Sequence, residues 1–330
     1  MRHVKTASEK YLSESMMTKK KCLICFEELS DPGMEYHISC CKKLFLSERP
    51  PEVPYLLSDM EELAGEIIKK HITVTGVQKK ISVDILSKPN EQKLTIVGLW
   101  GSYILKPPPK NYACLPENEA LTMEMAELCK INTVPHGLIR LKSGELAYIT
   151  RRIDRNGNEK THMEDMCQLS GRLTEDKYKG SVEQVGKIVK KHTLNVMLEI
   201  SRLFDVVVFS FITGNSDMHL KNFSLSYSDT SHVSLSPAYD LLSTHLVIPE
   251  KDDNEESALT INGKKRKLTK GDFFQLGTSW GLTEKQIQNA FKKIISKKAF
   301  LLEKINCSFL PVDMKKLYKS IILTGIEKIT

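Results

Sequence analysis

This chain of 330 residues has no long apolar run. Its most apolar stretch, residues 206–212, is far shorter than the roughly 20 residues that a helix needs to cross a bilayer. The first twenty residues are polar and contain no apolar core of a secretory signal. We therefore expect a cytoplasmic protein that makes no contact with a membrane.

Basic clusters interleaved with aromatic residues are also missing, although the formal net charge is +7. The lysines occur in short scattered groups, at 19–21, 190–191 and 264–267. A solvated surface explains this pattern better than a nucleic-acid groove does. We therefore expect no direct binding of nucleic acid.

The chain contains neither an internal repeat nor a low-complexity tract. Its content of 41% hydrophobic and 27% charged residues is ordinary for a globular protein, which excludes general disorder and the fibrous classes. A chain of this length is expected to form two lobes or domains around a large core.

The predicted elements change character near residue 157. Before it, strands are predicted over 72–77, 80–86, 94–105, 137–141 and 146–153, and helices over 59–70 and 117–129. After it, helices are predicted over 162–169, 181–191, 194–212, 283–298 and 311–324, with a short hairpin from 223–227 and 233–235.

This order predicts an α+β fold of two lobes. A small β-rich N-lobe covers residues 59–150, a hinge covers 151–156, and a larger helical C-lobe covers 157–330. A proline-rich linker at 47–58 separates them from a cysteine-rich unit at 1–46. Two lobes of this kind suit an enzyme whose site lies in the cleft between them.

The N-terminal unit has the spacing of a metal site. Cys22, Cys25, His37 and Cys40 follow the pattern C-x2-C-x11-H-x2-C, and three thiolates with one imidazole satisfy tetrahedral zinc. Cys41 beside Cys40 leaves the fourth ligand ambiguous, and small buried cysteines without metal are the alternative. A closed site with four ligands has no open position, so we expect no catalysis there.

A polar loop at residues 214–222 follows the most apolar stretch. It places Asp217 five residues before Asn222, and Asp240 follows 18 residues later. Phosphoryl transfer needs this set: one carboxylate accepts the proton of the attacking hydroxyl, while an amide and a second carboxylate hold magnesium on nucleotide phosphates. Ordinary caps and turns are the alternative for the same residue types.

Two features of the N-lobe could bind phosphate. Gly76 lies in a tight turn between predicted strands, where backbone N–H groups can approach phosphate oxygens, although an ordinary hairpin is the alternative. Lys106 ends a strand, from which its charge can reach a cleft or simply solvent. Either Glu119 or Glu124 on the following helix could orient it by ion pairing.

The connector at 151–155 lies between the two lobes. Its backbone groups could hydrogen-bond an adenine edge while Asp154 reaches the ribose, or it could be a charged linker.

In this order, the segments resemble the HipA-like serine/threonine kinases, the toxins of bacterial toxin–antitoxin systems. The matching stretches are 75–80, Lys106, 152–155, 214–222 and 239–242, within roughly residues 55–300. No large β-rich subdomain precedes the phosphate loop, so the chain is similar to the short HipT kinases of tripartite HipBST systems.

The resemblance implies a protein-kinase-like fold and ATP- and Mg²⁺-dependent phosphorylation of a Ser or Thr hydroxyl. The implied substrate is an aminoacyl-tRNA synthetase, whose modification inhibits translation. The implied partners are antitoxins, namely a HipB-like DNA-binding protein and a HipS-like small subunit. The implied location is the bacterial cytoplasm, and delivery into a host cell stays open.

The resemblance also implies roles for single residues. Asp217 becomes the catalytic base, Asn222 and Asp240 the magnesium ligands, and Lys106 a contact to the ATP phosphates. The other ATP-binding residues that it implies are Thr75, Gly76, Val77, Gln78, Lys79, Arg151, Ile153, Asp154, His219 and Lys221.

The family inactivates itself by phosphorylating a serine just before the loop glycine, and HipT-like kinases have a Ser-x-Ser pair there. This chain has Thr73 and Thr75 instead, which keeps both hydroxyls. Autophosphorylation is therefore predicted at one of them, because added negative charge would repel the nucleotide phosphates.

Two other functions compete with that of a protein kinase. A pseudokinase that serves as a binding module would lack a catalytic group, and none of the expected groups is missing. A small-molecule or lipid kinase would be favoured by a basic amphipathic helix facing a membrane, and the sequence shows none. A protein kinase is the function that the sequence favours.

Overall fold

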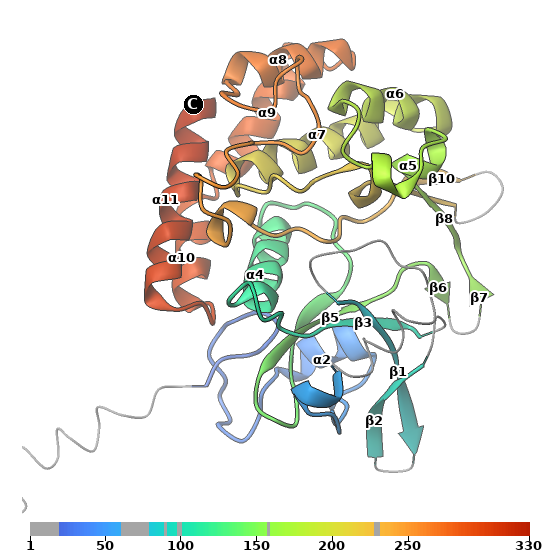
Figure 1. Cartoon of the computed structure of the whole chain (residues 1–330), viewed down its shortest axis with the longest axis vertical. Coiled ribbons are helices and arrows are strands. Elements are labelled where there is room, and N and C mark those ends of the chain that lie inside the picture. Colours follow the sequence, from blue (N-terminus) through green and yellow to red (C-terminus); the bar gives the residue numbers. More distant parts are fainter. Residues whose placement is uncertain (1–19, 61–78, 89–90, 98–100, 157–158, 228–231) are drawn as a thin grey trace, which may run out of the picture.

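The computed structural model describes residues 20–60, 79–88, 91–97, 101–156, 159–227 and 232–330. They form a sheet-containing lobe and a helical lobe, with a small N-terminal unit beside them (Figure 1). This is the mixed α+β architecture that the sequence predicts. None of the described helices is both long and apolar enough to span a bilayer.

The N-lobe is built on an antiparallel five-stranded sheet in the order β2-β1-β3-β5-β4. Its strands are β1 (Ile81–Lys88), β2 (Glu91–Ile96), β3 (Tyr103–Lys106), β4 (His136–Arg140) and β5 (Leu146–Arg151). In β1 the alternate residues Ile81 and Val83 are fully buried, so one face of the strand packs on the core.

Helix α4 (Leu115–Leu128) lies between the sheet and the C-lobe. It packs on β4 and β5 and also on α10, which explains why it is buried on nearly all sides. The Thr122 hydroxyl hydrogen-bonds the Tyr318 hydroxyl of α11 over 2.6 Å. Helix α4 therefore belongs to the cores of both lobes.

The C-lobe surrounds α7 (Val196–Ile212), which is buried from Leu203 to its end. The other helices are α5 (Met166–Leu169), α6 (Val182–His192), α8 (Lys270–Ser279), α9 (Glu284–Ile295), α10 (Lys298–Cys307) and α11 (Val312–Ile329). Helices α6, α9 and α11 pack directly on α7. Gly325 of α11 permits one close approach, because a Cβ there would lie 2.7 Å from the Ile212 backbone.

The remaining C-lobe elements are short. Strands β8 (His162–Asp165), β9 (Ser224–Tyr227) and β10 (Val233–Leu235) form an antiparallel sheet, and β6 (Arg155–Asn156) pairs with β7 (Glu159–Lys160). The 3₁₀ turns are η1 (Thr174–Asp176), η2 (Leu220–Asn222) and η3 (Thr244–Leu246).

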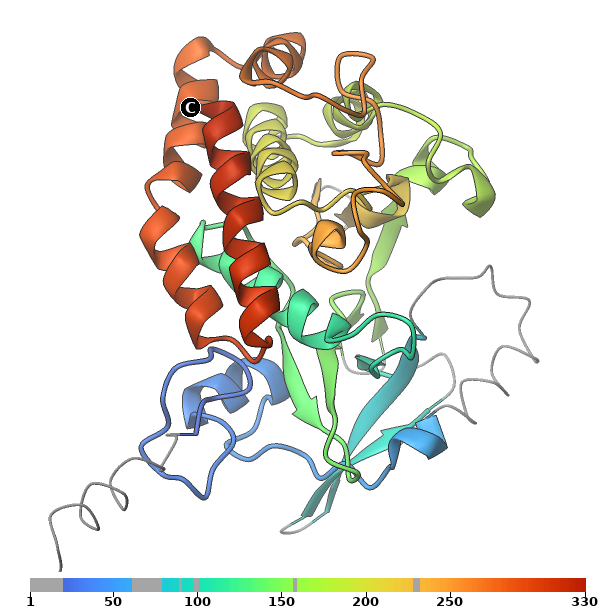
Figure 2. The ribbon, with the colours of Figure 1, turned by 60° about the vertical axis from the view of Figure 1, so that its left-hand side comes forward.

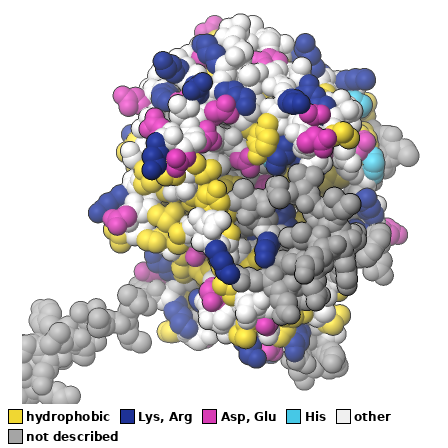
Figure 3. All heavy atoms as spheres, in the orientation of Figure 1, with side chains coloured by type: hydrophobic (Ala, Val, Ile, Leu, Met, Phe, Trp, Pro, Cys, Tyr) yellow, Lys and Arg dark blue, Asp and Glu magenta, His cyan; other side chains and the backbone are white. Residues whose placement is uncertain are grey.

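The N-terminal unit consists of an irregular hairpin and helix α2 (Ile38–Phe45). In Figure 2 it lies between the sheet and the lower ends of α10 and α11. Figure 3 shows Lys and Arg side chains dispersed among acidic ones on the face in view, which agrees with a solvated charged surface.

Most predicted elements are present, with local corrections. The helix predicted over 162–169 is wrong in its first half, where β8 pairs with β9 before the short α5 begins. The stretch 94–105 contains parts of two strands, and the helix predicted over 283–298 ends at Ile295. Helices α2, α8 and α10 were not predicted. Most of the predicted helix 59–70 and all of the predicted strand 72–77 lie outside the described residues.

Candidate active site

The candidate catalytic loop begins where α7 ends. Gly214 has φ +66°, a left-handed conformation that turns the chain away from the helix axis. The Thr244 hydroxyl donates to the Gly214 carbonyl over 3.0 Å and lies 2.7 Å from the Ser216 hydroxyl. Thr244 therefore holds the start of the loop at two points, Gly214 and Ser216.

Asp217 and Asn222 lie together in this loop. The Asn222 side-chain amide donates to the Asp217 backbone carbonyl over 3.0 Å, and the Asp217 N–H donates to the Asn215 side-chain oxygen over 3.1 Å. The turn η2 makes this contact feasible because it folds residue 222 back toward residue 217. The predicted base and the predicted amide ligand are thus neighbours in space.

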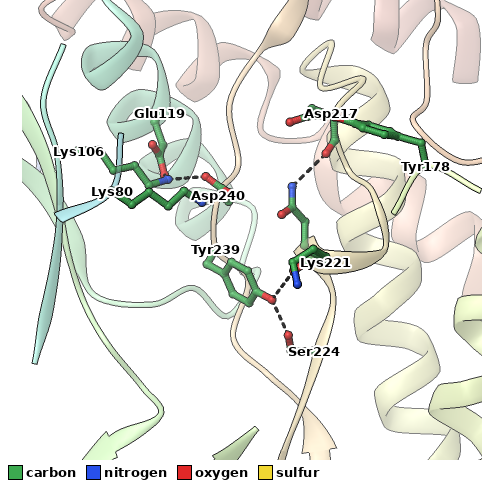
Figure 4. Close-up of polar contacts among 10 residues, drawn as sticks. Lys80, Lys106, Glu119, Tyr178, Asp217, Lys221, Ser224, Tyr239 and Asp240 are labelled. Atoms are coloured by element: carbon green, nitrogen blue, oxygen red, sulfur yellow. Dashed lines mark hydrogen bonds and ion pairs between the residues drawn. The ribbon is translucent and has the colours of Figure 1, made fainter. Parts of the chain in front are cut away.

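Asp240 lies at the centre of a cluster of charges (Figure 4). Its Oδ2 accepts from Lys80 Nζ over 2.9 Å, and its Oδ1 accepts a short bond from Lys106. Burial alone would raise the pKa of the Asp240 carboxyl, but the two ammonium groups outweigh it and hold that pKa well below its ordinary value. Asp240 is therefore an ionised carboxylate.

Lys106 is almost completely buried, with 3% of its surface exposed. Its Nζ donates to Glu119 Oε1 over 2.5 Å as well as to Asp240, and lies 5.2 Å from the centre of the Tyr148 ring. Burial alone would lower the pKa of Lys106, but the two carboxylates outweigh it and raise that pKa. Lys106 is thus a fixed cation that points at Asp240.

Of the two glutamates that could orient Lys106, Glu119 does so. It is fully buried, and this burial raises its pKa to about 7 despite the attraction of Lys106. Glu124 instead lies 3.8 Å from Lys304 of α10, whose ammonium also donates to Glu27 of the N-terminal unit.

Helix α4 also fixes the segment that follows Asp240. The Asn118 side chain donates to the Ser243 carbonyl over 2.8 Å and accepts from the Ser243 N–H over 2.9 Å. Tyr239 joins this segment to the catalytic loop, since its hydroxyl donates to the Lys221 carbonyl over 2.9 Å. Asp240 has φ +58°, and these bonds hold it in that uncommon conformation.

The site also contains a tyrosine that the sequence reasoning missed. The Tyr178 hydroxyl donates to Asp217 Oδ1 over 2.7 Å, and its ring lies edge-on to His219 with centroids 5.1 Å apart. The Lys177 carbonyl accepts from the Leu220 N–H over 3.1 Å, which holds this segment against the catalytic loop. No sequence signal identifies Tyr178, because it lies 39 residues from Asp217.

The residues predicted as the hinge, 151–156, run from the end of β5 into β6. The Arg151 N–H donates to the Pro135 carbonyl over 2.9 Å, and Ile153 is partly buried against the core. The Asp154 carboxylate, which was expected at a ribose, accepts two bonds from Arg152 over 2.6 and 2.8 Å. In this structure Asp154 is therefore engaged within its own segment.

The other described residues predicted to contact the nucleotide differ in burial and in their partners. His219 is buried, and that burial lowers its pKa, which favours the neutral ring. Lys221 pairs with Asp165 over 2.7 Å. Lys79 is exposed, whereas Thr73, Thr75, Gly76, Val77 and Gln78 lie outside the described residues.

A comparison with family models identifies the relationship. The model for the HipA-like C-terminal domain matches residues 72–299, more than two thirds of the chain. The chain belongs to this family. The match covers the sheet of the N-lobe, the hinge and most of the helical lobe.

Proteins similar in sequence to this HipA-like chain carry the name of kinases. A Haemophilus influenzae protein named "Putative kinase" is 28% identical over 290 residues, covering 79% of this chain and 82% of the relative. A Sinorhizobium fredii protein named "Putative kinase Y4dM" is 34% identical over 248 residues, covering 68% of this chain and 58% of the relative.

Two solved structures share the fold of this HipA-like chain. One is HipA of Shewanella oneidensis MR-1 in a complex with HipB and operator DNA, with TM-score 0.66 and 21% identity over 80% of this chain and 70% of that one. The other is the Helicobacter pylori proinflammatory kinase CtkA, with TM-score 0.53 and 14% identity over 76% of this chain and 93% of that one. The two-lobed kinase-like fold is thereby confirmed.

Lys80 is the second residue of the site that was missed. Lys80 directly precedes β1, and its half-exposed side chain forms an ion pair with Asp240. The sequence signal was its position at the end of the predicted phosphate loop, 75–80, where a cation meets the same anions as the loop backbone.

Proposed function

We propose that this HipA-like chain is a serine/threonine protein kinase that uses ATP and Mg²⁺ and acts as the toxin of a toxin–antitoxin system. The observation that carries the proposal is the Lys106–Glu119–Asp240 cluster, which is joined through Tyr239 to the loop of Asp217 and Asn222. Kinase-named relatives support the same reaction class.

The donor set of the site fits magnesium. Mg²⁺ prefers carboxylate and carbonyl-type oxygens, and Asp240 and Asn222 supply one of each from adjoining segments. Bound with ATP, the ion would neutralise charge on the phosphates. The exposed Lys80 can swing away from Asp240, whereas the buried Lys106 would keep its position and contact the phosphates.

Asp217 would accept the proton of the attacking hydroxyl. Its Oδ1 already accepts a phenolic O–H from Tyr178, so the carboxylate is placed to accept a bond from an alcohol. Nucleotide binding would also use the backbone of Arg151 and Ile153 and residues 75–79. His219 and Lys221 would support the loop from which Asp217 extends, and Asp154 would reach a ribose after releasing Arg152.

The proposed substrate is an aminoacyl-tRNA synthetase, whose phosphorylation would inhibit translation in the bacterial cytoplasm. The proposed partners are a HipB-like antitoxin, as in the Shewanella complex, and a HipS-like small subunit. Autophosphorylation of Thr73 or Thr75 would switch the kinase off.

One experiment tests the reaction. The purified chain is incubated with γ-³²P-labelled ATP, Mg²⁺ and bacterial lysate, and labelled proteins are identified by mass spectrometry. Wild type should label a synthetase on Ser or Thr, and Asp217→Asn should label nothing. If the wild type transfers label to no protein, itself included, the proposal is wrong.

A further inference from the structure

The N-terminal unit brings together four side chains that the proposed kinase reaction does not use. The ligand atoms of Cys22, Cys25, His37 and Cys40 all lie within 4.8 Å of one another. They come from two places: the cysteines 22 and 25 from the hairpin, and the other two from the start of α2. The neighbouring Cys41 is buried on the core side of α2 and is not part of this cluster.

The spacing of these atoms matches a tetrahedral ion. Zinc bonds of about 2.3 Å to sulfur and 2.0–2.1 Å to nitrogen place a tetrahedral S and N about 3.5 Å apart. His37 Nδ1 lies 3.3 Å from Cys25 Sγ and 3.9 Å from Cys40 Sγ, on either side of that value.

The backbone shapes the first half of the cluster. The Phe26 N–H donates to the Cys22 carbonyl over 3.0 Å and the Cys22 N–H to the Glu27 carbonyl over 2.9 Å, which closes a tight knuckle. Phe26 has φ +64°, so the chain reverses directly after Cys25. This knuckle points both thiols to the same side.

The second half is oriented for coordination. His37 Nε2 lies 3.0 Å from the Glu28 carbonyl, so this nitrogen carries the proton and donates it. The other ring nitrogen, Nδ1, is then a lone-pair donor facing the thiols, as in metal-bound histidines whose second nitrogen is held by a carbonyl. His37 is the N-cap of α2, and Cys40 lies one turn later on the same side.

We propose that Cys22, Cys25, His37 and Cys40 bind one structural zinc ion, which fastens the N-terminal unit to both lobes. Three thiolates and one imidazole in tetrahedral arrangement favour zinc over oxygen-preferring cations. All four positions are taken by protein, so the ion has a structural role.

The N-terminal unit contacts both lobes, and the ion would stabilise the segments that make these contacts. On the N-lobe side, the Leu138 N–H of β4 donates to the Leu23 carbonyl over 2.9 Å, and the Tyr36 hydroxyl donates to the Leu138 carbonyl. On the C-lobe side, Lys304 of α10 donates to the Cys25 carbonyl over 2.9 Å. A zinc ligand thus contacts α10 directly, and its neighbours in the knuckle contact the sheet.

The test measures bound metal in the full-length chain. We expect about one zinc per chain by elemental mass spectrometry after purification in reducing buffer from zinc-supplemented cells. Cys25→Ser with Cys40→Ser should reduce this to near zero. Cys307→Ser, which removes a partly exposed cysteine of α10 outside the cluster, should leave it unchanged. His37→Cys should keep the metal, because it preserves four ligands.

A second measurement covers the case in which the double variant does not fold. A mercurial reagent added to wild type should release zinc in step with the thiols that it blocks, and a chromogenic chelator detects the ion. Released zinc should be accompanied by a lower Tm, restored when zinc and reductant are returned. Wild type without zinc, iron in its place, or equal zinc in the double variant would overturn the proposal.

Discussion

Replacing Lys106 by methionine gives the sharpest test of the charge cluster. The substitution removes the cation between Glu119 and Asp240 but keeps a side chain of similar length. Glu119 is fully buried, and Lys106 is its ion-pair partner in the structure. Removing one member of a buried pair costs about 3–5 kcal/mol, because the charge left behind is uncompensated.

This cost should depend on pH. The pKa of Glu119 is about 7, above its ordinary value, so its protonation favours the folded state. That contribution is complete below the unfolded pKa and is lost as the pH rises through the folded pKa. Lys106 lowers the folded pKa of Glu119, so Lys106→Met raises it further. The variant should therefore lose about 3–5 kcal/mol at pH 8.5 and clearly less at pH 5.5, where Glu119 is neutral in both proteins.

Urea unfolding of both proteins at the two pH values measures this difference. Lys80→Met is the matched control, because Lys80 pairs with the same Asp240 but is half exposed. Exposed ion pairs contribute at most about 1 kcal/mol, so Lys80→Met should change the free energy of unfolding little at either pH. A loss for Lys106→Met that is equal at both pH values, or larger at pH 5.5, would refute the account of the cluster.

Three further predictions concern the loop and the helical core. Asp217→Asn should reduce phosphate transfer by at least about 10²-fold without lowering Tm, because it removes a base but little packing. A loss of activity accompanied by a lower Tm would indicate that Asp217 has a structural role. Tyr178→Phe removes a donor that competes with the substrate hydroxyl for Asp217, so kcat/KM should rise about 2–10-fold, as expected for one hydrogen bond; lower activity would mean that Tyr178 positions the carboxylate. Gly325→Ala should cost about 1–3 kcal/mol in urea unfolding, because its Cβ would lie 2.7 Å from the Ile212 backbone; Gly271→Ala in α8, where the nearest atom would be 3.6 Å away, should be neutral or stabilising, and equal effects would contradict the packing argument.

The sequence predicted the features that depend on local spacing. Asp217 and Asn222 are five residues apart, so a single turn brings them together, and the prediction needed no knowledge of the fold. The buried helix α7 before them was equally visible as an apolar stretch. The prediction for Lys106 stopped at two candidate partners, because Glu119 and Glu124 are on one helix and only packing decides which faces the sheet.

The sequence did not predict features that depend on contacts between distant segments. Strand β8 was predicted as helix because its residues suit either state, and its pairing with β9, some 60 residues later, decides the outcome. Tyr178 lies 39 residues before Asp217 and Lys80 lies 160 residues before Asp240, so neither contact follows from local spacing. The domain boundaries and the roles of the site residues stay predictions.

Helix α4 connects the N-terminal unit with the proposed active site. Near its start, Asn118 holds the segment after Asp240 and Glu119 holds Lys106. Near its end, Glu127 pairs with Lys43 of α2 over 2.5 Å. Because one helix makes both sets of contacts, an ion that fixed α2 would act on the end of α4 opposite to the one that holds Lys106 and the segment after Asp240. The proposed zinc site and the proposed kinase site are therefore linked by a continuous packed element.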